Sequence, residues 1–524
     1  MIIPDAAGSW QGEASIYPGL NPWALEEQIP ACAGTGRDQA SSPAQAGDCT
    51  IKAQGFSPGN PFGYNPPIMR QFDTARDAPE AIHAALTARD TARDAQVEAT
   101  VRAILDDVKA RGDAAVLDYT RRFDWPEATA ATLHFGWLLN QGFNNTPKSL
   151  LDILRQSYRN ISDYHAREYG HLQSWMHPFP SGILGQYVQP VERAGVYIPG
   201  GKATYPSTVL MAALPALIAG VKEIVICTPA NTQGEIDNFL AASIEFVLRT
   251  DEHSDHKVYK IGGAQAIAAM SYGTETVPKC DVIVGPGNAY VNTAKKLVYG
   301  EVGIDMLAGP SEVAVVADEG ANPTFVAADL LAQTEHGHDN RGVLFSHSFD
   351  ILEKCKNELA TQREALSRKE ILAVTANNLV FVKTNSLEES LALSNVFAPE
   401  HLELMVREPL AVLPLVKNAG AVLLGDHTSA PIGDYWAGPS HTLPTAGAAR
   451  YASPLSVATF MKRTSVLYYS QQAAQEAAED VARFAEAEGF DGHAQAARMR
   501  GGPGTGSAGL LAGESASGTE EQSS

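Results

Sequence analysis

The chain has 524 residues, with 39 Lys and Arg against 60 Asp and Glu, which gives a net charge of −21. This balance repels phosphate backbones and anionic membrane surfaces, so nucleic acid is not an expected partner. At about 150 residues per domain, the length predicts three or four domains, or two large ones with appendages. The 44% hydrophobic and 19% charged residues are typical of globular protein rather than of a disordered chain or a coiled coil.

Cysteine usage and apolar runs indicate a reducing location away from membranes. The five cysteines are scattered and form no C-x-x-C pair: Cys32, Cys49, Cys227, Cys280 and Cys355. The longest apolar run, residues 209–221, contains Pro215 and is shorter than the roughly 20 residues of a membrane span. We therefore expect a cytoplasmic protein that does not cross a membrane.

The two ends of the chain differ in composition from the part between them. Residues 1–69 are rich in Gly, Pro, Ser and Ala without a helical or strand period. Residues 501–524 lack the apolar residues that a core requires. Both segments are expected to be disordered. The N-terminal extension is open to three interpretations: a regulatory arm, a presequence, or a start codon placed too far upstream.

Helices open the folded part, and strands then alternate with helices. Between residues 78 and 123 apolar side chains recur at helical spacing, as at Val101, Ile104, Leu105 and Val108. Segments that contain short β-branched strands are 195–201, 222–230, 257–263, 280–288, 311–318, 342–347, 379–383 and 421–426. Helical patterns lie between most of them, and terminal helices are expected over 473–498. This order predicts an α/β fold with two Rossmann-like parallel-sheet domains and helical N- and C-terminal segments.

Two Gly-rich turns each join a predicted strand to a predicted helix, GGAQ at residues 262–265 and GPGN at residues 285–288. Backbone N–H groups at such a turn, together with the helix N-terminus, can bind an anion such as a dinucleotide. Neither turn matches G-x-G-x-x-G, and tight packing alone produces similar turns. A cofactor site and a turn that serves tight packing alone are therefore both open.

The most informative helix lies within residues 304–340. Asn322 and Pro323 are suited to its N-cap and its first position. Gln333 and His336 continue its apolar stripe at intervals of three, which places two polar side chains at the edge of a buried face. Buried polar groups need partners. A metal ion and a plain hydrogen-bond network are both open at this point.

Further segments bring acids close to histidines. Glu400 and His401 are adjacent after a proline and can act together as acid and base near neutral pH. Two other pairs lie in an irregular Gly- and Pro-rich stretch and on the two sides of a Gly-induced break between helices: Asp434 with His441, and Glu488 with His493. The His-rich cluster at residues 251–257 is expected to be a solvated loop. The zinc-hydrolase pattern H-E-x-x-H is absent.

An ordered series of motifs is more specific than any of these features alone. It consists of GVYIPGGKATYPSTVLM, IGGAQAIAA, VGPGNAYVNTAKK, IDMLAGPSEV, VAADLLAQTEH, APEHLEL, GDYWAGPSHTLPT and EGFDGHAQAARMR. In this order, and over roughly residues 69–500, the chain closely resembles the histidinol dehydrogenase family. The resemblance implies a dehydrogenase that uses NAD and one Zn²⁺ per subunit.

Functional residues follow from the resemblance position by position. The implied zinc ligands are Gln333, His336, Asp434 and His493. The implied substrate contacts are Ser311, Gln333, His336, His401, Asp434, His441, Glu488 and His493. The implied NAD contacts are Tyr197, Gln265 and Asn288.

The reaction implied by the resemblance is the last step of histidine biosynthesis. L-Histidinol is oxidised through L-histidinaldehyde to L-histidine, with two NAD and one water, while zinc holds and orients the substrate. His401 matches the family's base, and Glu400 is expected to help activate the water in the second step. A homodimer with sites completed across the interface is also implied, so Glu488 and His493 act either in cis or in trans.

The implied organisation has five parts: a disordered extension (1–69), a discontinuous α/β catalytic domain (70–190 plus 311–455), a Rossmann-like NAD-binding domain (191–310), a helical C-terminal segment for dimer contacts (456–500) and a disordered tail (501–524). Ser440 and Thr442 stand where the family commonly has Asn and Val. One alternative is a relative that oxidises another amino alcohol or a sulfonated diol, against which Glu488 argues. A zinc-dependent hydrolase and an inactive binding protein are the alternatives from other classes.

Overall fold

The computed structural model describes residues 69–88, 94–135, 140–200, 204–249, 255–335 and 337–502. It divides into two compact units, one with residues up to 166 plus 192–459 and one with residues 167–191 plus the chain from 460 onward. The expected disorder of residues 1–68 and 503–524 lies outside this description. Among the described residues, no helix combines the length and apolar character needed to span a bilayer.

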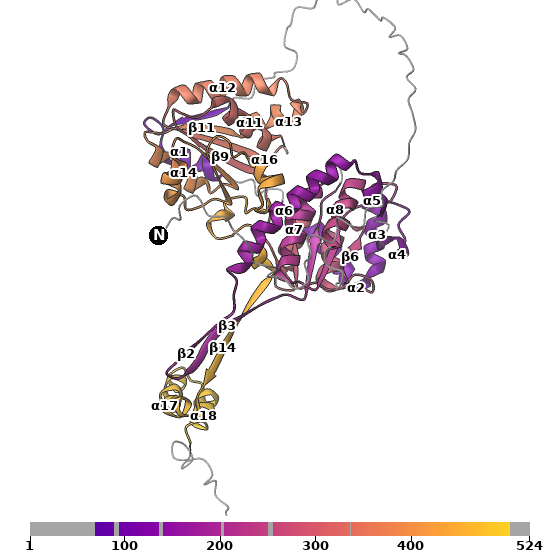
Figure 1. Cartoon of the computed structure of the whole chain (residues 1–524), viewed down its shortest axis with the longest axis vertical. Coiled ribbons are helices and arrows are strands. Elements are labelled where there is room, and N and C mark those ends of the chain that lie inside the picture. Colours follow the sequence, from indigo (N-terminus) through magenta and orange to yellow (C-terminus); the bar gives the residue numbers. More distant parts are fainter. Residues whose placement is uncertain are drawn as a thin grey trace, which may run out of the picture. The chain divides into compact units, whose positions relative to one another are not determined.

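The larger unit contains a six-stranded parallel sheet with helices on both faces (Figure 1). Its strands, in spatial order, are β1 (Arg70–Asp73), β11 (Leu379–Lys383), β10 (Arg341–Ser346), β9 (Glu312–Ala317), β12 (His401–Met405) and β13 (Ala421–Leu424). On one face lie α11 (Pro323–Thr334), α12 (Phe349–Arg363) and α13 (Lys369–Thr375), and on the other α1 (Pro79–Thr87) and α14 (Leu387–Phe397). Strands buried on both faces explain the continuous apolar runs in their sequences.

The same unit contains a five-stranded parallel sheet. Its order is β6 (Lys257–Tyr259), β5 (Glu223–Cys227), β4 (Arg193–Tyr197), β7 (Val282–Val284) and β8 (Gly303–Ile304). One group of packed helices is α2 (Asp94–Arg111), α3 (Asp113–Phe123), α9 (Gly263–Tyr272) and α10 (Ala289–Val298). The other helices of this region are α5 (Asn140–Asn145), α6 (Lys148–Gly170), α7 (Pro206–Ala219) and α8 (Asn238–Leu248). The predicted α/β class with two parallel sheets is confirmed.

The helices before residue 191 pack differently from the implied domain division. That division assigned residues 70–190 to the sheet that carries Glu400. Of the described residues in that range, only β1 and α1 pack there, because β1 pairs with β11. Helix α2 instead buries the predicted stripe of Val101, Ile104, Leu105 and Val108 in the core of the five-stranded sheet.

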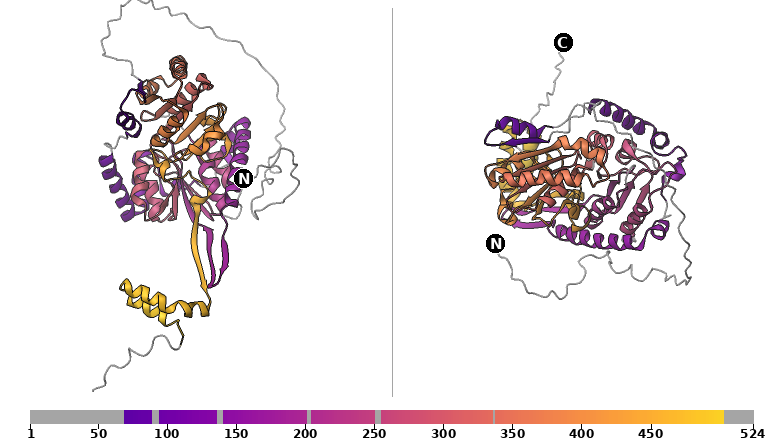
Figure 2. Two further views of the ribbon diagram at one scale, coloured as in Figure 1. Left: turned by 90° about the vertical axis from the view of Figure 1, so that its left-hand side faces the viewer. Right: turned by 90° about the horizontal axis from the view of Figure 1, so that it is seen from above.

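The smaller unit is an antiparallel sheet followed by two helices (Figure 2). Its strands are β2 (Trp175–Phe179), β3 (Gly182–Pro190) and β14 (Met461–Tyr469), and its helices are α17 (Gln471–Ala487) and α18 (Asp491–Arg498). The sequence predicted the helices but not this sheet. Every residue of β2 is exposed, so no alternation of buried and exposed side chains marks it as a strand.

Candidate active site

Three sequence-predicted segments meet at the amino edge of the six-stranded sheet. Ser311, Asn340 and Glu400 directly precede β9, β10 and β12, and these three strands are neighbours. The parallel register places His401 opposite Val313 of β9. Parallel pairing therefore brings together residues that are far apart in the sequence.

Glu400 and His401 form the buried centre of this cluster. Oε2 of Glu400 accepts a hydrogen bond from the backbone N–H of Glu312 at 3.0 Å. The same oxygen lies 3.8 Å from Nδ1 of His401, and Oδ1 of Asp434 lies 3.7 Å from Nε2 of that ring. The imidazole is therefore placed between two carboxylates, one on each ring nitrogen.

The pKa values of Glu400 and His401 are both raised, for different reasons. Burial is the main cause that raises the pKa of Glu400 to about 7, although His401 acts in the opposite direction. For His401, burial alone would lower the pKa. The carboxylates of Asp434 and Glu400 outweigh that effect, so the pKa of His401 is raised above its ordinary value. The site can thus exchange protons near neutral pH.

Gln333 occupies the end of α11 as the sequence predicted. Asn322 caps this helix, because its side chain accepts a hydrogen bond from the N–H of Thr324. The Gln333 side chain is buried. Asn340, which sequence reasoning missed, links Gln333 to Ser311: its Nδ2 donates to the Gln333 carbonyl (3.0 Å) and its Oδ1 accepts from the Ser311 N–H (3.2 Å).

Asp434 lies in a regular turn, which corrects the expectation of an irregular stretch. The short α16 (Ala430–Ile432) continues into a π-helical turn over Gly433–Ala437. Helix α6 holds this turn through two backbone carbonyls. The Ser157 hydroxyl donates to the carbonyl of Tyr435 at 2.8 Å, and the Asn160 amide donates to the carbonyl of Trp436 at 2.9 Å. The Gly- and Pro-rich composition of this stretch is therefore compatible with a wide helical turn.

His441 lies near the same turn. Its Nδ1 is 3.1 Å from the backbone carbonyl oxygen of Asp434, and its Nε2 is 3.5 Å from the hydroxyl of Thr208. The hydroxyl of Ser440 is buried and donates to the carbonyl of Met211. This contact fixes the loop before His441.

The predicted NAD contacts gather at the carboxyl ends of the five-stranded sheet. The Tyr197 hydroxyl accepts a hydrogen bond from the N–H of Gly263 at 3.1 Å. Gln265, two residues further on, is buried, and its Nε2 has no hydrogen-bond partner among the described residues. Exposed Asn288 caps α10 by accepting from the N–H groups of its first turn. An unpartnered amide beside a helix N-terminus is a feature that a ligand can satisfy.

A buried ion pair, which sequence reasoning missed, supports the second Gly-rich turn. Lys295 and Asp305 contact each other with both side chains fully buried. The Lys295 ammonium donates to the carbonyl of Gly285 at 2.9 Å, and the Asp305 carboxylate accepts from the N–H of Gly285 at 2.8 Å. Gly285 has φ of 112°, and a Cβ there would lie 2.1 Å from the carbonyl oxygen of Tyr197. Only glycine fits this turn.

Three predicted site residues are not part of this cluster as described. His336 lies outside the described residues. Glu488 and His493 belong to the smaller unit, where Glu488 ends α17 and Gly489 turns the chain with φ of 81° before α18. The predicted break between the two helices is therefore confirmed.

The His-rich cluster at residues 251–257 differs from its prediction in one respect. His253 lies outside the described residues. His256 is buried rather than solvated, and its Nδ1 accepts a hydrogen bond from the N–H of Ile224 at 3.1 Å. It serves the five-stranded sheet as a packing residue.

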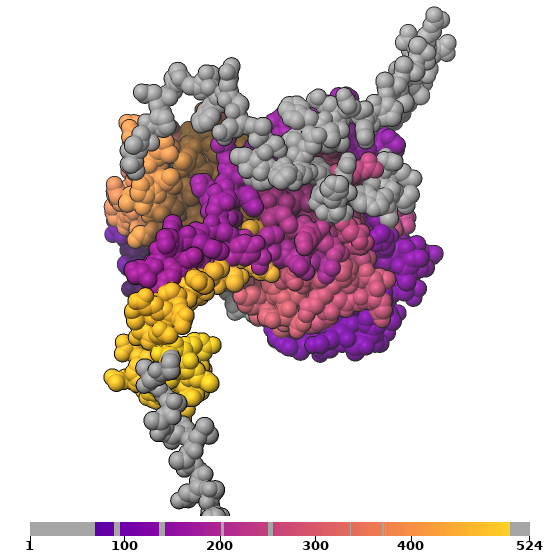
Figure 3. All heavy atoms as spheres, turned by 60° about the horizontal axis from the view of Figure 1, so that its bottom comes forward, coloured from indigo at the N-terminus to yellow at the C-terminus, as the bar shows by residue number. Residues whose placement is uncertain are grey.

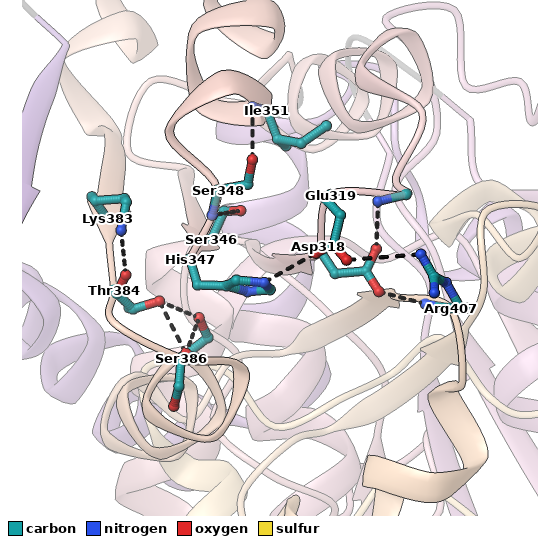
Figure 4. A network of polar contacts seen from close by, with 12 residues as sticks. Asp318, Glu319, Ser346, His347, Ser348, Ile351, Lys383, Thr384, Ser386 and Arg407 are labelled. Atoms are coloured by element: carbon teal, nitrogen blue, oxygen red, sulfur yellow. Dashed lines mark hydrogen bonds and ion pairs between the residues drawn. The ribbon is translucent and has the colours of Figure 1, made fainter.

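The carboxyl edge of the six-stranded sheet is closed by a polar network (Figure 4). The Asp318 carboxylate accepts from the N–H groups of Gly320 and Arg407, at 2.8 and 2.7 Å. Glu319 contacts the Arg407 guanidinium at 3.7 Å and Nε2 of His347 at 3.1 Å. In doubly wound sheets a ligand usually occupies this edge, where the strand order reverses. Here Asp318 fills the space between the ends of β9 and β12.

Comparisons with known proteins show which proteins this chain is similar to. A family model described as histidinol dehydrogenase matches residues 87–501. Histidinol dehydrogenase of a Synechococcus strain is 46% identical over 407 residues, which cover 77% of this chain and 92% of that protein. The enzyme of the same name from Oceanobacillus iheyensis is 44% identical over 419 residues, covering 79% and 95%. The crystal structure of histidinol dehydrogenase from Elizabethkingia anophelis aligns with a TM-score of 0.76 at 33% identity, covering 82% of this chain and 98% of that one.

Proposed function

The chain belongs to the histidinol dehydrogenase family, and from this premise we propose that it oxidises L-histidinol through L-histidinaldehyde to L-histidine, with two NAD and one water. The observation that carries the proposal is the buried imidazole of His401 between the carboxylates of Glu400 and Asp434. A base with two acidic neighbours suits the removal of a hydroxyl proton near neutral pH.

Zinc fits the chemistry of the donor set. The carboxylate of Asp434 and the side-chain oxygen of Gln333 are hard donors, and the imidazoles of His336 and His493 complete a mixed N/O set that zinc accepts. Within the described ranges, no three His, Cys, Asp or Glu side chains gather closely enough to hold a metal on their own. The proposed site therefore requires His336 and His493 in addition. When bound by these residues, zinc would supply a Lewis acid that orients the substrate.

His401 and Glu400 have different roles in the proposed reaction. His401 accepts the hydroxyl proton of histidinol as hydride leaves for the nicotinamide ring of NAD. Asp434 and Glu400 stabilise the imidazolium that results. Glu400, in its ionised form, accepts a proton from the water that adds to the aldehyde. His401 then assists the second hydride transfer.

The pKa of Glu400 leads to a pH-dependent second step. The carboxyl has a pKa of about 7, so it is mostly protonated below that pH and cannot accept a proton from water. We expect oxidation of L-histidinaldehyde to accelerate as the pH rises through about 7 and then to level off. Glu400→Gln should remove this rise and lower the plateau by about 10²–10⁴-fold. Rates with the aldehyde supplied as substrate measure both effects; an unchanged profile in the variant contradicts the role of Glu400.

The stoichiometry of NADH tests the proposed function as a whole. Purified protein should form about two NADH per L-histidinol consumed, because both oxidations occur before product release. A chelator should abolish this turnover and added zinc should restore it. Turnover of another amino alcohol or of a sulfonated diol, without turnover of histidinol, would keep the chemistry and overturn the substrate. Zinc-dependent hydrolysis without NAD reduction would overturn the dehydrogenase.

A second copy of the chain is the proposed partner of the smaller unit. This unit exposes many large apolar side chains: Trp175, Met176, Phe179, Ile183, Tyr187, Leu467, Tyr468, Tyr469, Val481, Phe484, Phe490 and Met499. Helices α17 and α18, yellow in Figure 3, present part of this surface. Exposed apolar patches of this kind mark interaction surfaces. We propose a homodimer in which Glu488 and His493 serve the site of the partner.

The compartment also follows from the chemistry of the thiols. Cys227, Cys280 and Cys355 are free and buried, and burial raises the pKa of each thiol. Free thiols agree with a reducing environment. We accordingly propose a cytoplasmic enzyme.

A further inference from the structure

Two buried carboxyl groups face each other beneath the active-site cluster. Asp329 of α11 is 8% exposed, and Glu403 of β12 is 1% exposed. Within the described ranges, no Lys, Arg or His side chain forms an ion pair with either group. Neither residue belongs to the donor set or to the acid–base pair assigned above.

The position of this pair follows from the periods of the helix and the strand. Asp329 precedes Gln333 by four residues, so the two side chains lie one turn apart on the same face of α11. Glu403 follows His401 by two residues, so both point to the same face of the sheet. Met405, two residues further along, packs in one core cluster with the apolar residues of α11. The carboxyl pair therefore lies between this core and the site.

Electrostatics favours one proton on the pair. Burial raises the pKa of Asp329 to about 6 and is also the main cause that raises the pKa of Glu403 well above its ordinary value. The charge of Asp329 raises the pKa of Glu403 further, because two adjacent carboxylates in the interior repel each other. With both groups ionised, neither oxygen of Glu403 has a hydrogen-bond donor. A proton on either carboxyl supplies one.

The pair also contacts the segment that leads to Asp434. The only influence that opposes the pKa shift of Glu403 comes from the backbone N–H of Ala430, which points toward the carboxyl from beyond hydrogen-bond distance. Ala430 is the first residue of α16, and α16 continues into the turn that carries Asp434. No other titratable side chain among the described residues contributes to the shift of either carboxyl.

We propose that Asp329 and Glu403 share one proton and act as positioning residues that fix α11, β12 and the α16 segment relative to one another. These three elements carry Gln333, His401 and Asp434, so the shared proton sets the spacing between two metal ligands and the base. The inference rests on the proposed function for the roles of those three residues. The proton sharing itself does not depend on the substrate.

Variants of Glu403 separate the shared proton from mere packing. Glu403→Ala removes one carboxyl and leaves Asp329 buried without a partner. We expect zinc affinity, measured by competition with a chelator, and kcat to fall by about 10- to 100-fold. Glu403→Gln keeps the volume, and its amide N–H replaces the shared proton as donor to Asp329. It should restore both quantities to within about threefold of the original chain, the scale of a modest hydrogen-bond difference.

The pH dependence of stability gives a readout without substrate. A carboxyl whose pKa is raised in the folded state favours folding while it is protonated, and this advantage is lost as the pH rises through that pKa. Melting temperature should therefore fall as the pH rises above the ordinary carboxyl pKa of about 4.5, and it should fall less steeply in Glu403→Gln than in the original chain. The infrared difference spectrum between the original chain and Glu403→Gln at pH 8, where Glu400 is ionised in both proteins, should contain the band of a buried protonated carboxylic acid.

Asp318→Ala is the matched control, because Asp318 is a buried acid at the opposite edge of the same sheet. It should lower stability but leave zinc affinity within about threefold of the original value. Equal zinc loss in Glu403→Gln and Glu403→Ala, or the absence of the band from the pH 8 difference spectrum, overturns the proposal. An enzyme that does not oxidise histidinol but retains the band and the zinc response contradicts the proposed function and leaves this inference intact.

Discussion

His401→Ala should reduce kcat by about 10²–10⁴-fold while the protein retains its zinc. The imidazole lies between Glu400 and Asp434 without belonging to the donor set, so its removal takes away the base rather than a ligand. The raised pKa of His401 means that its imidazole keeps the proton that it accepts from the substrate, and the variant lacks this group. Turnover and bound zinc per subunit are the two measurements.

A histidine at the other edge of the sheet provides the control for this variant. His347 contacts Glu319 in the network of Figure 4, and His347→Ala should leave kcat within about twofold of the original value, as expected for a surface substitution. Loss of zinc from His401→Ala would show that the ring supports the metal site instead. Unchanged turnover would exclude His401 as the base.

Lys295→Met should cost about 3–5 kcal/mol of stability, because Asp305 would remain buried as an uncompensated charge. The effect should extend to the cofactor, since both residues hold Gly285 in its turn. We expect KM for NAD to rise more than KM for histidinol. Urea denaturation and steady-state kinetics measure the two effects.

The adjacent lysine makes this prediction specific. Lys296 is 54% exposed and lies 3.6 Å from Glu98, whereas the Lys295 side chain is 0% exposed. Lys296→Met should change stability by less than about 1 kcal/mol, as is usual for a surface pair. Lys295→Met with Asp305→Asn should recover part of the loss, because no charge is then left alone. Similar losses at both lysines would contradict the buried-pair argument.

The parallel sheets could be predicted from the sequence because their strands are buried on both faces. Runs such as residues 311–318 and 379–383 read as strands without knowledge of their partners. Gln333 could be singled out because it continues the apolar stripe of its helix. Glu400 and His401 were adjacent in the sequence, but their role as acid and base came from the family resemblance. Order along the chain did not reveal which edge of the sheet they share.

Buried charges were missed because their partners are distant in the sequence. Lys295 lies on the buried face of α10 with Val291 and Val298, a helical spacing that marks it as an unusual lysine. Its partner Asp305 comes ten residues later, after an intervening turn and a strand. Asn340 gave no signal, because a lone amide before a strand is common at turns. Only the fold shows that Lys295, Asp305 and Asn340 each form a hydrogen bond with a particular backbone group.

The pairing of β1 with β11 joins segments about three hundred residues apart. During synthesis, all strands of the five-stranded sheet are available once residue 304 has left the ribosome. The six-stranded sheet cannot form fully until residues 312–424 have also been made. Strand β3 likewise cannot pair with β14 until residues 461–469 have been made. The nascent chain therefore acquires its cofactor turns first and its acid–base centre late, and it carries unpaired strand edges that invite association for most of its translation.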